Sequence, residues 1–214
     1  MKGPRVGKFL VLLVIVPLLI SCSVKDKTFP KATVGIQPYE PFNRSQADTI
    51  AAVIAKVYGF KVHVLKALPI PAQTFVNEKS PRYRADKILR IQDEQRPDSL
   101  DFILGVTSYD ISTTKRDDDG NIKKPVTKYS DWGIMGLGYR PGQSCVVSTF
   151  RIKGDEKKFR ERLKKICIHE IGHNLGLDHC KTEGCVMADA AETIATIDHV
   201  KATLCAACRR RLRD

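Results

Sequence analysis

An eleven-residue stretch holds most of the residues that could do chemistry. Between His169 and His179 the chain reads HEIGHNLGLDH, so three of its five histidines fall in one window. If the residues before Leu175 are helical, His169 and His173 lie one turn apart on one face and can reach one ion. A left-handed turn at Gly176 can then bring His179 back as a third ligand.

Three imidazole ligands leave one position of a tetrahedral zinc ion for water, as in a catalytic rather than a structural site. Glu170 follows the first ligand directly and is placed to take a proton from that water. The stretch therefore predicts a zinc-dependent hydrolase with Glu170 as the general base. A buried helix with stray histidines is the alternative.

A second group of metal-binding residues begins directly after this stretch. The spacing is C-x4-C, a gap, then C-x2-C, and the residues are Cys180, Cys185, Cys205 and Cys208. Four thiolates in two close pairs suit a zinc site with no open position, which is structural in role. Two local disulfide loops or buried thiols are the alternatives. The sequence thus predicts two zinc ions per chain.

The stretch from His169 to Cys208 resembles the archaemetzincins, a family of zinc metalloproteases in the metzincin clan. Its HExxHNLGLxHC motif, the C-x-M after it and the final CxxC match the family pattern. Upstream the resemblance is looser and depends on residues 104–107 and 147–149. The resemblance implies that this chain hydrolyses peptide bonds and that Met187 is the Met-turn residue, packed beneath the three histidines.

The resemblance also implies the fold. We expect an α/β fold of the α+β type, with a mixed twisted sheet, backing and active-site helices, and a small C-terminal subdomain that has a helix and the four-cysteine site. The catalytic domain is expected over residues 32–214. A cleft would divide an upper part, 32–176, from a lower part, 177–214.

Apolar periodicity upstream of the motif alternates between strand and helix. Strands are predicted over residues 32–37, 61–68, 100–106, 131–139 and 145–150. Helices are predicted over residues 43–58, 83–93, 155–175 and 190–204.

The glycine-rich strand over residues 131–139 is the candidate edge of the cleft. In metzincins the edge strand pairs with an extended substrate, and glycine lets another backbone approach closely. A turn over residues 140–143 would join it to the next strand. An irregular loop around Trp132 is the alternative.

The first residues of the chain predict export. Lys2, Arg5 and Lys8 precede an apolar run over residues 9–20, which has the shape of a secretory signal and is short for a membrane span. The run leads into Leu-Ile-Ser-Cys, which ends at Cys22 and resembles a bacterial lipobox.

The lipobox resemblance implies cleavage before Cys22 and attachment of lipid to its thiol. Residues 1–21 are then a signal peptide of the lipoprotein type, and residues 22–31 a short polar tether. Several acyl chains hold a protein stably on a membrane. We therefore expect an exported, membrane-anchored bacterial lipoprotein on the periplasmic or cell-surface side. A plain signal peptide or a retained anchor helix are the alternatives.

Charge and length limit the other functions. The formal net charge is +12, and it falls to +9 once residues 1–21 and their three cations are removed. The 193 residues that remain of 214 fit one domain. Aromatic residues are not interleaved with the basic ones, so we expect no nucleic-acid binding. We expect a monomer that acts on peptide or protein substrates, with a solvated basic tail over residues 209–213.

The remaining cysteines and histidines are not expected to bind metal. Cys145 and Cys167 are expected to be buried free thiols, and His63 and His199 to be surface or satisfied core residues. Thiols in an oxidising compartment tend to pair as disulfides, so an exported zinc–thiolate site is an oddity. Bound zinc would protect the sulfurs by occupying them.

Two other functions remain open. One is a membrane-anchored zinc-binding module without physiological protease activity, although such a module has no need of Glu170. The other is an aminopeptidase rather than an endopeptidase, which would need an acidic group near the cleft to hold a free α-amine. The sequence does not identify such a group.

Overall fold

The computed structural model describes residues 1, 3, 31–189 and 194–213. Apart from residues 1 and 3, the predicted signal peptide lies outside these residues, as do the predicted lipidation residue Cys22 and most of the tether. In the described part of the chain, no helix is both long enough and apolar enough to cross a membrane.

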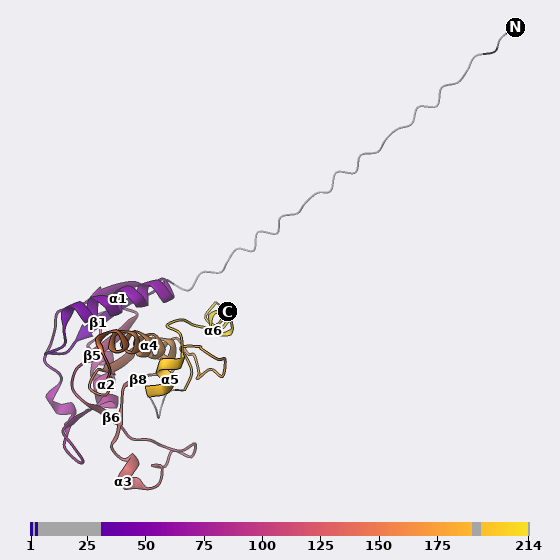
Figure 1. Cartoon of the computed structure of the whole chain (residues 1–214). Helices are drawn as coiled ribbons and strands as arrows, with labels where there is room; N and C mark the ends of the chain where they lie inside the picture. The colour runs from indigo at the N-terminus through magenta and orange to yellow at the C-terminus, as the bar shows by residue number, and fades with distance from the viewer. Residues whose placement is uncertain (2, 4–30, 190–193, 214) are drawn as a thin grey trace.

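Five strands form the central sheet (Figure 1). In spatial order they are β2 (Lys61–Val64), β1 (Thr33–Pro38), β5 (Phe102–Thr107), β9 (Ser144–Ser148) and β8 (Gly136–Gly138). The first four run parallel, and β8 runs antiparallel to β9. Because β8 ends the spatial order, its second edge has no partner strand among the described residues.

Helices cover both faces of this sheet. α1 (Arg44–Tyr58) and α4 (Glu156–Asn174) pack on one face and form the larger apolar core with it. α2 (Ala85–Gln95) packs on the opposite face, where it meets Val146 of β9. Burial on both faces explains why the predicted strand over residues 100–106 is almost continuously apolar. The mixed α/β fold class is confirmed.

Side-chain caps fix where the two long helices begin. Asn43 Oδ1 accepts a hydrogen bond from the N–H of Ser45 at 2.8 Å, and Asp155 Oδ1 accepts one from the N–H of Lys158 at 2.9 Å. Gly59 ends α1 in the left-handed conformation, with φ of 73°. The predicted bounds of both helices agree with the structure to within one residue.

A second sheet of four strands lies along the cleft. Its strands, in spatial order, are β3 (Phe75–Val76), β4 (Arg82–Arg84), β6 (Ile111–Thr113) and β7 (Trp132–Ile134). Two short helices, η1 (Ala72–Thr74) and α3 (Val126–Tyr129), precede β3 and β7.

The prediction of one continuous strand over residues 131–139 is wrong. β7 pairs with β6 and β8 pairs with β9, so the segment passes from one sheet to the other at Met135. The choice between two partner strands is a tertiary one, and a local glycine-rich pattern does not encode it. The hairpin between β8 and β9 is as predicted, and the N–H of Tyr139 donates to the carbonyl of Ser144 at 3.1 Å.

The predicted final helix over residues 190–204 is too long. Its structured part, α5 (Ile194–His199), ends five residues before the predicted bound, and residues 190–193 lie outside the described part. The N–H of Lys201 donates to the carbonyl of Gly184 at 2.9 Å instead of continuing the helix. The backbone here therefore pairs with the loop before Met187.

Two other predicted bounds also differ. α2 begins at Ala85 because Tyr83, predicted to be helical, pairs with Ile111 in the second sheet. The strand predicted over residues 61–68 ends at Val64. A further helix, α6 (Ala206–Arg211), follows Cys205 directly and was not predicted.

Candidate active site

The end of α4 has the turn that the sequence predicts. Gly176 has φ of 85°, a left-handed conformation that glycine adopts at little cost. Its N–H donates to the carbonyl of His173 at 2.8 Å, and the N–H of Leu177 donates to the carbonyl of Gly172 at 3.0 Å. This pair of bonds is the Schellman motif, which satisfies the last carbonyls of a helix. The chain leaves α4 sharply and returns His179 towards the helix.

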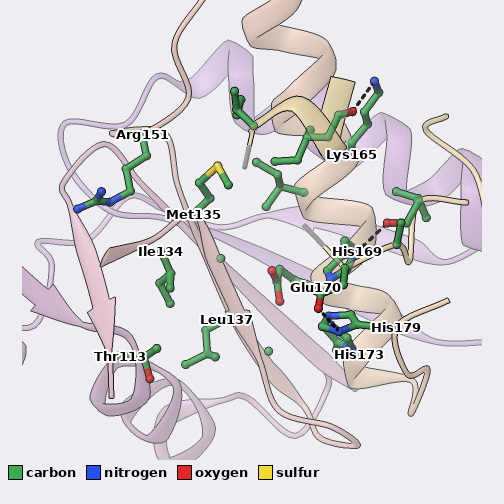
Figure 2. A pocket seen from close by; sticks show the side chains of 18 of the residues that line it. Thr113, Ile134, Met135, Leu137, Arg151, Lys165, His169, Glu170, His173 and His179 are labelled. Atoms are coloured by element: carbon green, nitrogen blue, oxygen red, sulfur yellow. Dashed lines mark hydrogen bonds and ion pairs between the residues drawn. The ribbon is translucent and has the colours of Figure 1, made fainter. Parts of the chain in front are cut away.

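The three histidines meet at one point of the cleft (Figure 2). Their ring centroids lie 4.5 to 5.4 Å apart, and one ligand atom from each lies within 4.8 Å of the others. His169 Nδ1 lies 2.9 Å from the carbonyl of Val186, and His173 Nδ1 lies 2.8 Å from that of Leu177. A carbonyl only accepts, so each Nδ1 carries the proton and each Nε2 keeps its lone pair for a metal.

Electrostatics keep two of these rings neutral at neutral pH. Burial, and after it the neighbouring His173, lowers the pKa of His169 to about 4. Burial also lowers the pKa of His173. His179 is more exposed, and its Nδ1 lies 3.6 Å from a carboxylate oxygen of Asp189. Neutral imidazoles bind zinc, so the donor set fits that ion.

Met187 has no exposed surface and packs against Gly172 of the HEIGH motif. A Cβ placed on Gly172 would lie 2.4 Å from the sulfur of Met187 and 3.2 Å from the hydroxyl of Tyr58. The glycine inside the HEIGH motif therefore lets the methionine reach the backbone of α4. The Tyr58 hydroxyl also donates to the carbonyl of Ile168 at 2.7 Å, which ties α1 to the turn of α4 that carries His169.

Glu170 lies between α4 and the edge strand β8, and only 7% of its surface is exposed. A Cβ on Gly136 would lie 2.4 Å from its Oε1, and a Cβ on Gly138 would lie 2.9 Å from its backbone carbonyl. The alternate glycines of β8 thus make room for Glu170, in addition to exposing the strand backbone. The sequence contains these glycines, but their partner on another element could not be inferred from it.

Replacing Gly136 by Ala should lower kcat about 100-fold while zinc binding is kept. The added methyl group displaces the Glu170 carboxylate, and a 1 Å misplacement of a reacting group can cost that much. Steady-state kinetics and metal analysis of the purified variant measure both quantities. A wild-type kcat would show that the position of Glu170 does not matter.

Burial raises the pKa of the Glu170 carboxyl to about 8 in the metal-free protein, whereas the unfolded chain has a glutamate pKa of about 4.3. Because the pKa of Glu170 is higher in the folded state than in the unfolded state, its contribution to the free energy of unfolding is fully present below about pH 4.3. This contribution is lost as the pH rises towards 8. Metal-free wild type should therefore lose stability relative to Glu170→Gln, on the order of 3 kcal/mol between pH 5 and 8.

Urea unfolding of both metal-free proteins at pH 5, 6.5 and 8 measures this difference. The two proteins differ only in whether residue 170 can ionise, so their comparison isolates that carboxyl. If the difference in unfolding free energy between the two proteins stayed constant with pH, the raised pKa of Glu170 would be contradicted.

The cleft around these residues has a volume of about 630 Å³. One side of the cleft is lined by the edge strand β8 and the second sheet (Figure 2). The other side is lined by α4, by residues 186–189 around Met187 and by α5. Its wall near α5 is apolar, with Ile194, Ile197 and Val200. The cleft is open to solvent at His179, whose side chain is 42% exposed.

Asn174 is a site residue that the sequence analysis missed. Its side-chain amide is 3% exposed and donates to the carbonyls of Tyr139 and Ser144, at 3.0 and 2.9 Å. The last residue of α4 thereby holds the turn of the β8–β9 hairpin. A polar residue in the helix beside a metal ligand is the only signal in the sequence.

The four predicted cysteines meet in a second cluster, with one sulfur from each within 4.8 Å of the others. The sulfurs of Cys180 and Cys205 are 3.8 Å apart, as are those of Cys185 and Cys208. A tetrahedron with zinc–sulfur bonds of about 2.3 Å has edges of about 3.8 Å, so the group fits zinc. A disulfide needs about 2.05 Å, so none of these sulfurs is paired.

Backbone N–H groups point at these sulfurs. Those of Thr182, Cys205 and Cys208 donate to Cys180, Cys185 and Cys205, at 3.4 to 3.5 Å. Burial acts to raise the pKa of Cys205, but the hydrogen bonds that it accepts outweigh burial and lower it. Such bonds favour the thiolate form that binds metal.

The other predicted residues lie outside both clusters. Cys145 and Cys167 are buried free thiols, as predicted. His63 and His199 are exposed and take part in neither group.

Comparison with known proteins decides the family. Residues 32–214 match the model of peptidase family M54. The chain belongs to this family. The archaemetzincin of Halobacterium salinarum is 28% identical over 167 residues, which cover 73% of this chain and 86% of that relative. The archaemetzincin of Archaeoglobus fulgidus is 28% identical over 181 residues, or 84% of this chain and 98% of the relative.

Solved structures of the M54 family agree with the fold. The crystal structure of Archaeoglobus fulgidus archaemetzincin complexed with malonate has a TM-score of 0.67 at 27% identity, covering 84% of this chain and 99% of that one. The Methanopyrus kandleri archaemetzincin has a TM-score of 0.68 at 22% identity, over 88% and 96%, and supports the fold alone. The resemblance to archaemetzincins is confirmed, and this M54 chain is a zinc metallopeptidase.

Proposed function

We propose that the three-histidine group, His169, His173 and His179, holds the catalytic zinc and that Glu170 is the general base. The observation that supports this most directly is the convergence of the three histidines in one cleft that the buried Glu170 also lines (Figure 2). Zinc bound there supplies Lewis acidity, which polarises a carbonyl and lowers the pKa of a water.

Glu170 supplies the proton transfers. Its carboxylate accepts a proton from the attacking water and later donates one to the leaving amine. A carboxyl with a raised pKa, about 8 without the metal, holds a proton more readily than an exposed glutamate does, which suits both steps. Glu170 lines the cleft, so its carboxylate can contact a water there.

The free edge of β8 binds the substrate. A peptide in extended conformation adds to this edge as a further strand, and main-chain pairing makes little demand on its sequence. The hydrogen bonds place the scissile bond beside Glu170, because β8 runs directly over that side chain. The substrate is therefore a peptide or an unfolded segment of a protein.

An endopeptidase is the form of the activity that we favour. Besides Glu170, Asp189 is the only carboxylate among the described cleft residues, and it lies against His179. An aminopeptidase would need a carboxylate to hold the α-amine of its substrate. Because Asp189 pairs with His179, we do not assign it this role, and we therefore favour an endopeptidase. Cleavage of peptides with acetylated N-termini distinguishes the two activities, since an aminopeptidase cannot process them.

The four-cysteine group, in this proposal, holds a second zinc with a structural role. All four tetrahedral positions are filled by sulfur, so no water or substrate can bind. The ligands join the loop after α4 to the start of α6, and so stabilise the lower side of the cleft.

Export and lipid anchoring are a separate proposal that depends on the sequence of residues 1–31. Acyl chains on Cys22 would hold the catalytic domain at a membrane through the short tether. Expression of wild type and Cys22→Ser in a bacterium with radiolabelled palmitate tests this proposal. Equal labelling of the two proteins would contradict it.

The experiment that tests the peptidase proposal is metal removal and restoration. Chelator-treated mature protein should cleave no member of a mixed peptide library, and two equivalents of zinc per chain, one for each metal group, should restore cleavage. The wild type, treated and untreated, is its own control. Cleavage that survives complete removal of zinc would contradict the proposal.

A further inference from the structure

One end of the cleft carries an arginine that is fixed in place. Arg151 lies at the end of the pocket away from the histidines (Figure 2), and 35% of its side chain is exposed. Its guanidinium lies against the backbone of Gly133 in β7, where a Cβ would be 2.0 Å from Nη2 and 2.7 Å from Nε. Any other residue at position 133 would displace it.

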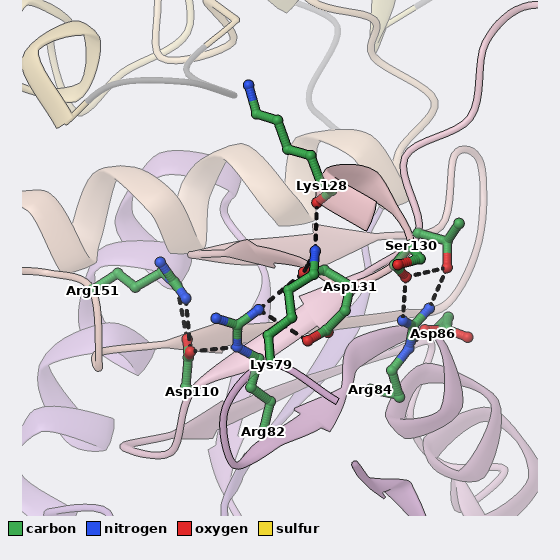
Figure 3. Close-up of polar contacts among 10 residues, drawn as sticks. Lys79, Arg82, Arg84, Asp86, Asp110, Lys128, Ser130, Asp131 and Arg151 are labelled. Atoms are coloured by element: carbon green, nitrogen blue, oxygen red, sulfur yellow. Dashed lines mark hydrogen bonds and ion pairs between the residues drawn. The ribbon is translucent and has the colours of Figure 1, made fainter. Parts of the chain in front are cut away.

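A buried ion network holds this guanidinium (Figure 3). Arg151 Nε and Nη2 donate to the two oxygens of Asp110, each at 2.7 Å. Arg82 shares Asp110 at 3.0 Å and contacts the fully buried Asp131 at 3.1 Å. A bidentate pair fixes the plane of an arginine. The pair with Asp110 uses Nε and Nη2 and leaves Nη1 of Arg151 for another group.

Asp110 and Asp131 balance the charges of Arg82 and Arg151, and two lysines beside this network add positive charge. Lys115 also lines the cleft and lies over the ring of Trp132, the residue before Gly133, at 4.7 Å, and Lys128 lies 5.2 Å from that ring. The two carboxylates among the described cleft residues, Glu170 and Asp189, are both at the histidine end. An anionic group of the substrate is therefore attracted to the Arg151 end.

The spacing fits a bound peptide. Gly133 lies three residues before Gly136, which faces Glu170, and because the chain bends between them at Met135 they lie at most about 11 Å apart. A substrate that pairs antiparallel to β8 runs from Gly138 towards Gly133. The substrate segment that follows the scissile bond then passes Arg151. The substrate residue nearest Arg151 comes about three residues after the one opposite Gly136.

We propose that Arg151, supported by Lys115, binds a carboxylate of the substrate on the C-terminal side of the scissile bond. This inference depends on the proposed peptidase function and names its substrate class: peptides with an acidic residue there, or with a free C-terminus at that distance. The two sources present the same carboxylate to a guanidinium.

The test uses a peptide that the wild type cleaves, with blocked N-terminus. Glu, Gln or Lys is placed in turn at each of the four positions after the scissile bond, with an amidated C-terminus. A second series has Gln at these positions and ends in a free carboxylate or an amide after two, three or four residues. We expect kcat/KM to be about 10-fold higher for Glu than Gln at one position, or for carboxylate than amide at one length.

Two variants and a control assign the preference to the named residues. Arg151→Gln should reduce the ratio of kcat/KM between the Glu and Gln peptides, or between the carboxylate and amide peptides, towards one. Lys115→Glu should shift the preference in favour of the Lys peptide. The ratio is measured within each variant, so a general loss of activity cancels. Arg44→Gln, which removes an exposed cation of α1 outside the cleft, should keep the wild-type ratio.

The outcomes separate the two proposals. Cleavage of all peptides within two-fold of one another would overturn the carboxylate site while leaving the peptidase intact. A preference that survives both Arg151→Gln and Lys115→Glu would overturn it as well. Wild-type protein that cleaves no peptide in the presence of zinc would overturn both proposals.

Discussion

Glu170→Gln should lower kcat by about 10²- to 10⁴-fold while the zinc content stays at the wild-type value. Glutamine has the same shape but cannot accept the proton of the water, and it does not ligate the metal in our account. The Nδ1 bonds of His169 and His173 to main-chain carbonyls are independent of Glu170, so the metal site stays assembled. Steady-state kinetics on an amidated peptide and metal analysis measure the two quantities.

A matched carboxylate control is available in the same motif. Asp178 is exposed and pairs with Arg140 and Arg211 at 3.2 Å, outside the catalytic group. Asp178→Asn should keep kcat within a few-fold of wild type, because exposed ion pairs contribute little. If Glu170→Gln turned over peptides as fast as Asp178→Asn, the general base would have to be another group.

Cys208→Ser should remove one zinc ion per chain and lower the free energy of unfolding by at least about 3 kcal/mol. Cys208 is 3% exposed, and its sulfur lies 3.8 Å from that of Cys185. Serine is a poor zinc ligand and leaves three thiolates without their cation. Metal analysis and urea unfolding of the variant measure the loss.

The same variant should also lower kcat, because the two metal groups share one loop. Val186 lies between Cys185 and Met187, and its carbonyl accepts the Nδ1 proton of His169. The N–H of Cys180 donates to the carbonyl of Met187 at 2.8 Å. A loop released from the sulfur site no longer holds His169 in the orientation that zinc needs.

Cys167→Ala is the control for this experiment. Cys167 is equally buried but lies outside the four-cysteine group, so its variant should lose stability through a small cavity and keep both zinc ions. Equal zinc contents in Cys208→Ser and Cys167→Ala would contradict the structural metal site.

The local parts of this site could be predicted from the sequence because their causes are local. The left-handed turn at Gly176 and the cap at Asp155 each depend on a few neighbouring residues. The i, i+4 spacing of His169 and His173 likewise needs only a helix to place both rings on one face.

The parts that were missed depend on residues far apart in the chain. The strand switch at Met135 is a choice between β6 and β9, and α5 ends early because Lys201 pairs with Gly184. The fit of Gly136 to Glu170 and of Gly133 to Arg151 requires knowing which elements face each other. A glycine pattern shows that space is needed but not for which partner.

The central claim is that three imidazoles hold one zinc ion with a position left open. Anomalous diffraction at the zinc absorption edge, from crystals of the mature protein, tests it most directly. We predict a peak about 2.1 Å from Nε2 of His169, His173 and His179, with no fourth protein ligand. A peak bound by a fourth side chain, or no peak beside these rings in zinc-loaded protein, would contradict the account.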